Sequence, residues 1–311
     1  MKLAMIFPGQ GSQAVGMLKG YDGLPEMANV ADQAARALGV DFVKLMDHGP
    51  AEALNLTVNT QPAMVTAGYA VYRAWHALGG PAPEIVAGHS LGEYTALTVA
   101  GALEFKDCLP LVRFRAQSMQ EAVPEGKGAM AAILMLEDDV VRAACAEAGG
   151  EVQAVNFNAP GQVVIAGERQ AVARAIEACK AKGAKRAMPL PVSAPFHSTL
   201  MRPAAARLAT YLEKVAVLTP HITVINHVDV AIERDPARIK DALVRQAASP
   251  VRWVETIGKM VAMGATHIIE CGPGKVLAGM TKRIAPQVQS LSLSERASLE
   301  AALGVLCSKA S

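Results

Sequence analysis

The chain has 311 residues, of which 51% are hydrophobic, and a formal net charge of only +2. This length suits one large domain, or a domain into which a second one is inserted. Acidic and basic residues are scattered rather than grouped, so the composition indicates neither a nucleic-acid partner nor an anionic membrane surface.

The cysteines and the apolar runs bear on the cellular compartment. The five cysteines are odd in number and never form a C-x-x-C pair: Cys108, Cys145, Cys179, Cys271 and Cys307. We therefore expect buried, reduced thiols and neither a disulfide nor a metal site. The apolar run that ends at Phe7 is too short for a signal peptide, and no run approaches the length of a membrane span. We expect a cytoplasmic protein with no membrane partner.

Short apolar runs alternate along the chain with longer, alanine-rich segments of helical periodicity. The expected strands are Leu3–Phe7, Ile85–Ala87, Ile222–Asn226, His267–Cys271 and Ser290–Leu293. The expected helices include Gln61–Leu78, Leu91–Ala100, Asp107–Ala122, Pro203–Val215, Ala237–Gln246 and Val251–Met263. This alternation predicts an α/β fold with a parallel sheet that helices cover on both faces.

The segment Gly128–Pro191 departs from this alternation. Its predicted elements are, in order, strand Ala129–Leu136, helix Asp138–Ala148, strands Glu151–Asn156 and Gln162–Ala166, helix Gln170–Lys182 and strand Arg186–Pro189. The order βαββαβ is typical of a ferredoxin-like domain, and the flanks are rich in proline and glycine. We therefore expect a large α/β domain of residues 1–126 and 193–311, an inserted domain of residues 127–192, and a cleft between them.

Four segments follow the predicted strands of the large sheet. They are Pro8–Gln13, Gly88–Tyr94, Asn226–Val230 and Cys271–Leu277. In an open parallel sheet, ligands bind beyond the carboxyl ends of the strands. We therefore expect these segments to converge on a binding site.

The first candidate site residue is Ser90, in the sequence Gly88-His89-Ser90-Leu91-Gly92. The pattern G-x-S-x-G between a strand and a helix is typical of a nucleophile elbow. The glycines allow a sharp turn, and the following helix N-terminus favours a developing oxyanion. The alternative interpretation is a serine that only caps the helix.

A serine nucleophile needs a base. His89 is adjacent to Ser90 in the chain, so its side chain is expected to point away. His197 lies where the chain leaves the inserted segment, which places it at the expected cleft, and His227 is the rival candidate. A carboxylate to orient the base has no obvious position, although Asp229 is possible.

Two glycine-rich loops resemble nucleotide-binding motifs only in part. The loop Pro8–Gln13 begins a degenerate G-x-G-x-x-A pattern, but the segment around Asp32 is predicted to be helical where a dinucleotide fold needs a second strand. We interpret this loop as one that brings backbone amides near Ser90. The loop Gly272–Lys275 is no Walker A motif, because Val276 stands where serine or threonine is required.

Arg115 lies in a predicted helix, on the same face as Leu111, Ser118 and Met119. An arginine on an inward face is costly unless its guanidinium meets a carboxylate. That carboxylate is either an internal Asp or Glu or a group on the substrate, and the pattern does not choose between them.

Seven motifs occur in an order that resembles the malonyl-CoA:acyl carrier protein transacylases of bacterial type II fatty acid synthesis. They are PGQGSQ, GHSLGE, RFRAQSMQEAVPEGKGAMAA, NAPGQVVIAG, PFHS, VRQAASPVRW and ECGPGKVL. The resemblance runs from about Leu3 to about Arg283, and it implies a hydrolase-like α/β core with a ferredoxin-like insert.

The resemblance also implies roles for individual residues. Ser90 would be the nucleophile, His197 its base, and the main-chain carbonyl of Gln246 the group that orients the histidine in place of a carboxylate. The backbone amides of Gln10 and Leu91 would form the oxyanion hole.

Arg115 would bind the free carboxylate of the malonyl group. The sequence departs from the family at His227, where asparagine is common, and at Phe196, where a smaller residue is common; the second departure bears on the choice of acyl group.

The implied activity is transfer of malonyl from malonyl-CoA, through an ester on Ser90, to the phosphopantetheine thiol of acyl carrier protein. The implied reaction needs neither a metal nor a redox cofactor, and we expect a monomer. Two alternatives stay open: a serine esterase or thioesterase on the same core, and a non-catalytic α/β binding module.

Overall fold

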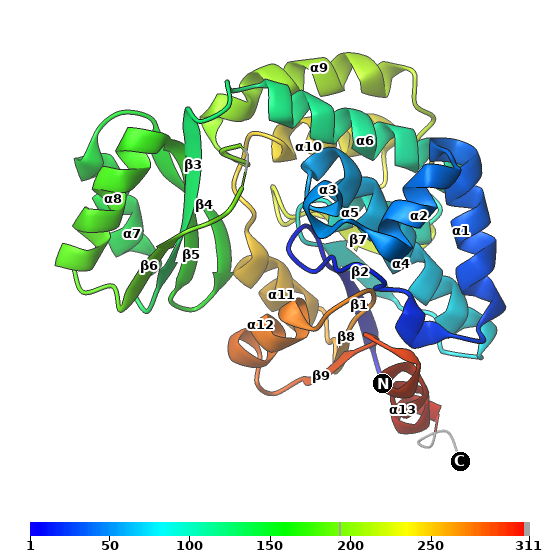
Figure 1. The fold of residues 1–311 in the computed structure, drawn as a ribbon. Coiled ribbons are helices and arrows are strands. Elements are labelled where there is room, and N and C mark those ends of the chain that lie inside the picture. The colour runs from blue at the N-terminus through cyan, green and yellow to red at the C-terminus, as the bar shows by residue number, and fades with distance from the viewer. Residues whose placement is uncertain (193, 308–311) are drawn as a thin grey trace.

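The computed structural model describes residues 1–192 and 194–307. Its larger sheet is wholly parallel and has the strand order β7-β2-β1-β8-β9 (Figure 1). The strands are β1 (Leu3–Phe7), β2 (Ile85–Gly88), β7 (Thr223–Ile225), β8 (His267–Glu270) and β9 (Gln289–Ser292). The parallel sheet predicted from the apolar runs is confirmed.

Helices cover both faces of this sheet. They are η1 (Lys19–Tyr21), α1 (Pro25–Leu38), α2 (Val40–His48), α3 (Ala51–Leu54), α4 (Thr57–Ala77), α5 (Gly92–Val99), α6 (Phe105–Glu121), η2 (Thr199–Met201), α9 (Arg202–Glu213), α10 (Pro236–Gln246), α11 (Trp253–Ala262), α12 (Val276–Ile284) and α13 (Arg296–Cys307). The region before Gln61 holds helices that the sequence patterns did not delimit, and α13 was not predicted.

Strand β1 explains why both faces must be covered. Leu3, Met5 and Phe7 pack into a core with helices that include α1, α4, α5 and α6. Ala4 and Ile6 point the opposite way, into a second core with α11 and α12. Because neighbouring residues of a strand point to opposite faces, a wholly apolar strand is stable only between two layers.

The second sheet is antiparallel and has the order β4-β5-β3-β6 (Figure 1). Its elements are β3 (Gly128–Leu134), α7 (Asp138–Ala148), β4 (Val152–Ala159), β5 (Gln162–Glu168), α8 (Arg169–Ala181) and β6 (Arg186–Pro189). The predicted βαββαβ order is confirmed, and the strand order is that of a ferredoxin-like sheet.

The two faces of this second sheet have different partners. One face packs against α7 and α8 through residues such as Ile133 and Ile165. Met130 and Val164 on the other face contact Met119 of α6 and Phe196. The segment after β6 therefore lies between the two sheets.

Four of the cysteines are buried in this fold. Cys108, Cys145, Cys179 and Cys271 are buried free thiols, as predicted, whereas the side chain of Cys307 lies outside the described part of the chain. Within residues 1–192 and 194–307, no helix is long and apolar enough to cross a membrane.

Candidate active site

Ser90 lies at a sharp turn between β2 and α5. Its φ of 51° is in the left-handed region, which residues other than glycine rarely adopt. A Cβ at Gly88 would lie 1.8 Å from the carbonyl carbon of Gly92, and one at Gly92 would lie 2.0 Å from the carbonyl oxygen of Phe7. Only glycine fits at both positions, so the predicted elbow is present and its backbone holds Ser90 in a strained conformation.

His197 completes a pair with Ser90. The Oγ of Ser90 lies 2.7 Å from Nε2 of His197, and Nδ1 of His197 donates to the main-chain oxygen of Gln246 at 2.9 Å. Because a carbonyl oxygen only accepts, Nδ1 carries the hydrogen and Nε2 is left to accept the serine proton. Burial, together with the charge of Arg115, lowers the pKa of His197 to about 3. The imidazole is therefore neutral near pH 7 and able to act as a base.

Arg115 of α6 reaches the same point from the other side. Its Nη2 donates to Ser90 Oγ at 3.3 Å and to Oε1 of Gln246 at 2.9 Å, and its Nη1 donates to Oε1 of Gln61 at 2.8 Å. The guanidinium also lies over the ring of Tyr94, 5.4 Å from the ring centre.

The side chain of Arg115 is only 2% exposed, yet its hydrogen-bond acceptors are neutral. Among the described residues, no Asp or Glu forms an ion pair with it. The alternative of an internal salt bridge is therefore wrong. A buried guanidinium without an anionic hydrogen-bond partner can receive a carboxylate from a ligand.

The loop after β1 passes close to the elbow. A Cβ at Gly9 would lie 2.6 Å from the main-chain oxygen of His89 and 3.8 Å from the amide nitrogen of Leu91. Within the described residues, neither the amide of Leu91 nor that of Gln10 donates a hydrogen bond. The expected approach of the glycine-rich loop to the elbow is present, and both amides are available to a ligand.

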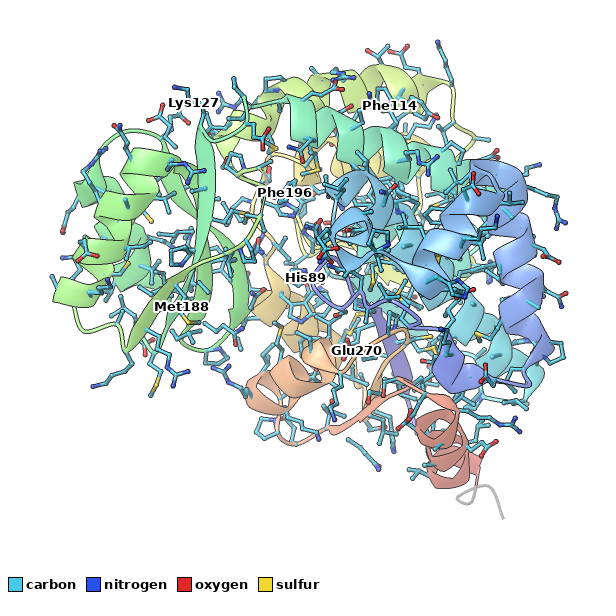
Figure 2. The ribbon with its side chains drawn as sticks, in the orientation of Figure 1. His89, Phe114, Lys127, Met188, Phe196 and Glu270 are labelled. Atoms are coloured by element: carbon cyan, nitrogen blue, oxygen red, sulfur yellow. The ribbon has the colours of Figure 1, made fainter. Side chains whose placement is uncertain are left out.

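A pocket opens at this point between the two sheets. Its lining comes from the loops after β1 and β2, from helices α4 and α6, from strands β3 and β4, and from the segment after β6: Gln10, Gln61, His89, Ser90, Leu91, Arg115, Met119, Met130, Asn156, Leu190, Val192, Phe196 and His197. Figure 2 shows His89 and Phe196 in the space between the two parts of the molecule. The predicted cleft is present.

Comparison with known proteins gives the family. A model described as "Acyl transferase domain" matches residues 4–299. The malonyl CoA-acyl carrier protein transacylase of Escherichia coli (strain K12) is 52% identical over 97% of this chain and 99% of its own. The chain belongs to the malonyl CoA-acyl carrier protein transacylases.

Solved structures of such transacylases have the same fold. The acyl-carrier-protein S-malonyltransferase of Burkholderia pseudomallei 1710b is 61% identical, with a TM-score of 0.96 over 97% of this chain and 99% of its own. A malonyl-transacylase solved in complex with a type II PKS acyl-carrier protein is 49% identical, with a TM-score of 0.96 over 98% of this chain and all of its own. The mixed α/β architecture of this transacylase is thus that of its relatives.

Two expectations about the surroundings of His197 can now be decided. Asp229 forms a bidentate ion pair with Arg245, in which each of its carboxylate oxygens lies 2.6 Å from a guanidinium nitrogen. The idea that Asp229 orients His197 is therefore wrong. His227 is buried against His197, with the ring centres 5.9 Å apart at an angle of 81°. Ser90 therefore contacts His197 rather than His227, and His89 turns away from the serine to contact Oδ1 of Asn158 at 2.8 Å.

Neither glycine-rich loop has the structural context of a nucleotide-binding motif. Asp32 lies inside α1, where a dinucleotide-binding fold would need a strand. The loop Gly272–Lys275 leads into α12, with Val276 as its first residue. In the described part of the chain, no group of three His, Cys, Asp or Glu side chains could hold a metal ion.

Sequence analysis missed three contributors to the site of this transacylase. Gln61 and Tyr94 hold the guanidinium of Arg115, and Glu93 is buried beside His227. Gln61 lies on a helix with no distinguishing pattern. Glu93 and Tyr94 belong to the segment Gly88–Tyr94 that was expected to converge on the site, but the sequence assigned no role to either, and only their buried contacts show what they touch.

Proposed function

We propose that this enzyme transfers a malonyl group from malonyl-CoA, through an ester on Ser90, to the phosphopantetheine thiol of acyl carrier protein. The observation that carries the proposal is the buried Arg115 guanidinium, 3.3 Å from Ser90 Oγ and without an ion pair to any described Asp or Glu. Malonyl differs from acetyl by one carboxylate, which this guanidinium would bind through its planar fork.

In the first half of the reaction, Ser90 attacks the thioester carbonyl. His197 Nε2 takes the hydroxyl proton as the new C–O bond forms, and the C–S bond to CoA then breaks. The same proton passes from His197 to the leaving thiolate. The products are a malonyl ester on Ser90 and free CoA.

The negative charge of the tetrahedral intermediate falls on the former carbonyl oxygen. We assign the backbone amides of Gln10 and Leu91 to that oxygen, since neither amide donates a hydrogen bond to any described residue and the two loops meet at Gly9. Leu91 immediately precedes α5, so the helix dipole adds to the stabilisation. Such preorganised donors typically contribute about 2.7–4 kcal/mol each.

In the second half, the carrier thiol takes the place of CoA. His197 removes the thiol proton, the sulfur attacks the ester carbonyl, and the proton returns to Ser90 as the C–O bond breaks. The Gln246 carbonyl orients His197 throughout without adding a negative charge. We propose that this neutral partner leaves the histidine basic enough for a thiol but a poor activator of water.

The experiment is intact mass measurement after incubation with malonyl-CoA. We expect one malonyl group on the wild-type protein and none on Ser90→Ala, with Ser12→Ala in the neighbouring loop as the matched control. The label should persist until the phosphopantetheinylated carrier is added. Rapid loss of the label to water without carrier would indicate a hydrolase, and failure to label would indicate a binding module.

We propose further that the enzyme is a cytoplasmic monomer that needs neither a metal nor a redox cofactor, and that residues 127–192 form a domain inserted between residues 1–126 and 193–311. The separate core of the antiparallel sheet with α7 and α8 supports the division. The buried free thiols of Cys108, Cys145, Cys179 and Cys271 support a reducing compartment. Sedimentation of the purified chain tests the monomer.

A further inference from the structure

Glu93 is a buried acid that the proposed reaction does not use. It lies on α5 three residues after Ser90, and it is 2% exposed. Its Oε2 accepts from the backbone amide of His227 at 3.1 Å and lies 3.6 Å from Nε2 of the same residue. Among the described residues, no lysine or arginine forms an ion pair with it.

Glu93 and Arg115 act on each other electrostatically. Burial raises the pKa of Glu93 and lowers that of Arg115, and the opposite charge of the other group works against each of these shifts. The next residue of α5, Tyr94, lies against the guanidinium. In the substrate-free protein, an ionised Glu93 therefore compensates part of the charge of Arg115, whose hydrogen-bond acceptors among the described residues are all neutral.

The other groups around Glu93 stabilise its ionised carboxylate only weakly. Burial is the largest effect and raises the pKa of Glu93 to about 7, and Asp229 adds to the rise. The amide of His227 and the side chain of Gln246 oppose it. The ring of His227 is itself buried, which holds its pKa well below the usual range, so it brings no positive charge.

A small cavity lies beside Glu93, apart from the active-site pocket. This cavity of about 10 Å³, room for about one water molecule, is lined by Glu93, Asn226 and Glu233. The side chain of Glu233 is 23% exposed, whereas Nδ2 of Asn226 has no hydrogen-bond partner among the described residues. A water molecule in this cavity would give Glu93 a proton donor and acceptor outside the active-site pocket.

We propose that Glu93 takes up one proton from solvent when the malonyl carboxylate binds Arg115, and so passes the role of counter-charge to the substrate. The inference rests on the proposed function. Two carboxylates that share one buried cation cannot both stay ionised at low cost, and the one without a direct bond to the guanidinium is the one that neutralises. Glu93 is a positioning residue in this scheme, since it acts on the substrate only through Arg115.

The sign of the pH dependence follows. In the free protein Glu93 is ionised above about pH 7, and bound malonyl raises its pKa further. Binding of malonyl-CoA therefore weakens as the pH rises above about 7, by up to about tenfold per pH unit. Acetyl-CoA has no carboxylate to bind Arg115, so its affinity should lack this dependence.

The experiment is titration calorimetry of acyl-CoA binding to the Ser90→Ala protein at about pH 8. The number of protons taken up follows from the difference in binding enthalpy between two buffers with different ionisation enthalpies. We expect malonyl-CoA to bind with uptake of about one more proton than acetyl-CoA, which carries the same CoA phosphates. Glu93→Gln in that background should remove the extra proton and make malonyl-CoA affinity nearly independent of pH. Glu233→Gln, on the solvent side of the cavity, is the matched control and should retain the uptake.

Binding of malonyl-CoA with the same proton count as acetyl-CoA would overturn the inference and leave the proposed function intact. Failure of malonyl-CoA to bind at all would overturn both. If Glu93→Gln does not fold, the infrared difference spectrum of the Ser90→Ala protein decides: a new protonated-carboxyl band on addition of malonyl-CoA supports the inference, and its absence contradicts it.

Discussion

The Nη2 of Arg115 lies 3.3 Å from the Oγ of Ser90, so a buried cation adjoins the candidate nucleophile directly. A substrate acyl group on Ser90 would therefore carry any further carboxylate within reach of the guanidinium. Malonyl has such a carboxylate and acetyl does not, so Arg115 should favour transfer of malonyl over transfer of acetyl.

Arg115→Ala should reduce the rate of malonyl transfer by roughly 30- to 1000-fold, because a lost hydrogen bond between a buried charge and its partner typically costs about 2–4 kcal/mol. Acetyl transfer should be kept or increased. Arg113→Ala is the matched control, since Arg113 lies on the same helix with its guanidinium over Phe42 instead. Single-turnover rates with both acyl-CoA substrates provide the test, and equal losses for the two acyl groups would contradict the role of Arg115.

The rate of acylation at saturating malonyl-CoA should be flat from about pH 8 down to about pH 5. His197 must be unprotonated to accept the serine proton, and burial, together with the charge of Arg115, lowers its pKa to about 3 in the substrate-free protein. Burial is the larger cause and persists when malonyl compensates the charge of Arg115, so the rate should fall only well below the ordinary pKa of histidine. An ordinary histidine base would lose activity near about pH 6.5. Rapid-quench measurement gives the profile, and a decline centred near that ordinary value would show that the histidine is not perturbed.

Phe196→Ala should raise methylmalonyl transfer relative to malonyl transfer by about tenfold, which is the scale of one methyl group in an apolar pocket. Phe196 lines the pocket, precedes His197 and packs against the apolar face that includes Met119 and Met130. Leu190→Ala enlarges the same pocket farther from His197 in the chain and should change the ratio less. Competition between the two acyl-CoA substrates measures the ratio, and an unchanged ratio in Phe196→Ala would rule out this residue as a selectivity determinant.

Gly92→Ala should destabilise the protein by about 3 kcal/mol or more, because the added Cβ would lie 2.0 Å from the carbonyl oxygen of Phe7 in the central strand. Gly258→Ala, in the middle of α11, meets nothing within 4 Å and should stabilise the protein by roughly 0.5–1 kcal/mol through its higher helix propensity. Urea unfolding of the two variants supplies the comparison. Similar unfolding midpoints would show that the elbow tolerates a side chain.

Transfer to acyl carrier protein, but not loading of Ser90, should slow as salt is added. Acyl carrier proteins are acidic, and four basic residues that we expect near the mouth of the cleft are exposed: Lys185 and Arg186 where β6 begins, and Lys275 and Lys282 at α12. Reversing the charge of Lys185 and Arg186 together should lower the second-order rate of transfer by roughly tenfold at low salt.

Lys44→Glu is the control for this surface, because Lys44 is exposed on α2, on the opposite side of the molecule in Figure 1. Its rate of transfer should be unchanged. A rate that is flat across a salt series in the wild-type protein would exclude an electrostatic docking surface.

Much of the fold was predictable because its signals are local. The apolar run Leu3–Phe7 specifies a strand that must be buried on both faces, and the βαββαβ pattern of Gly128–Pro191 follows from short-range periodicity. The helices before Gln61 were harder to delimit: α2 and α3 have only nine and four residues, fewer than the window over which a helical period can be recognised, and only Gly39 separates α1 from α2.

The site was predictable to different degrees. Ser90 and Arg115 were found from a local motif and a helical face, and the histidine from its position at a segment boundary. Asp229 was a wrong candidate, since Arg245 engages it, and nothing in the local sequence distinguished Glu93 from a solvated acid.

The sequence by itself determined the elbow, because Gly88 and Gly92 permit a sharp turn in which a Cβ at either position would clash with neighbouring backbone. Only the tertiary structure decided what the elbow faces. His197 is 107 residues from Ser90 in the chain, and the carbonyl that orients it is 49 residues farther on. The backbone conformation of a turn is set by neighbours along the chain, whereas the partners of a buried charge depend on which elements pack together. Here that packing leaves Arg115 without an ion pair to any described Asp or Glu. Its guanidinium can therefore receive the carboxylate of a ligand.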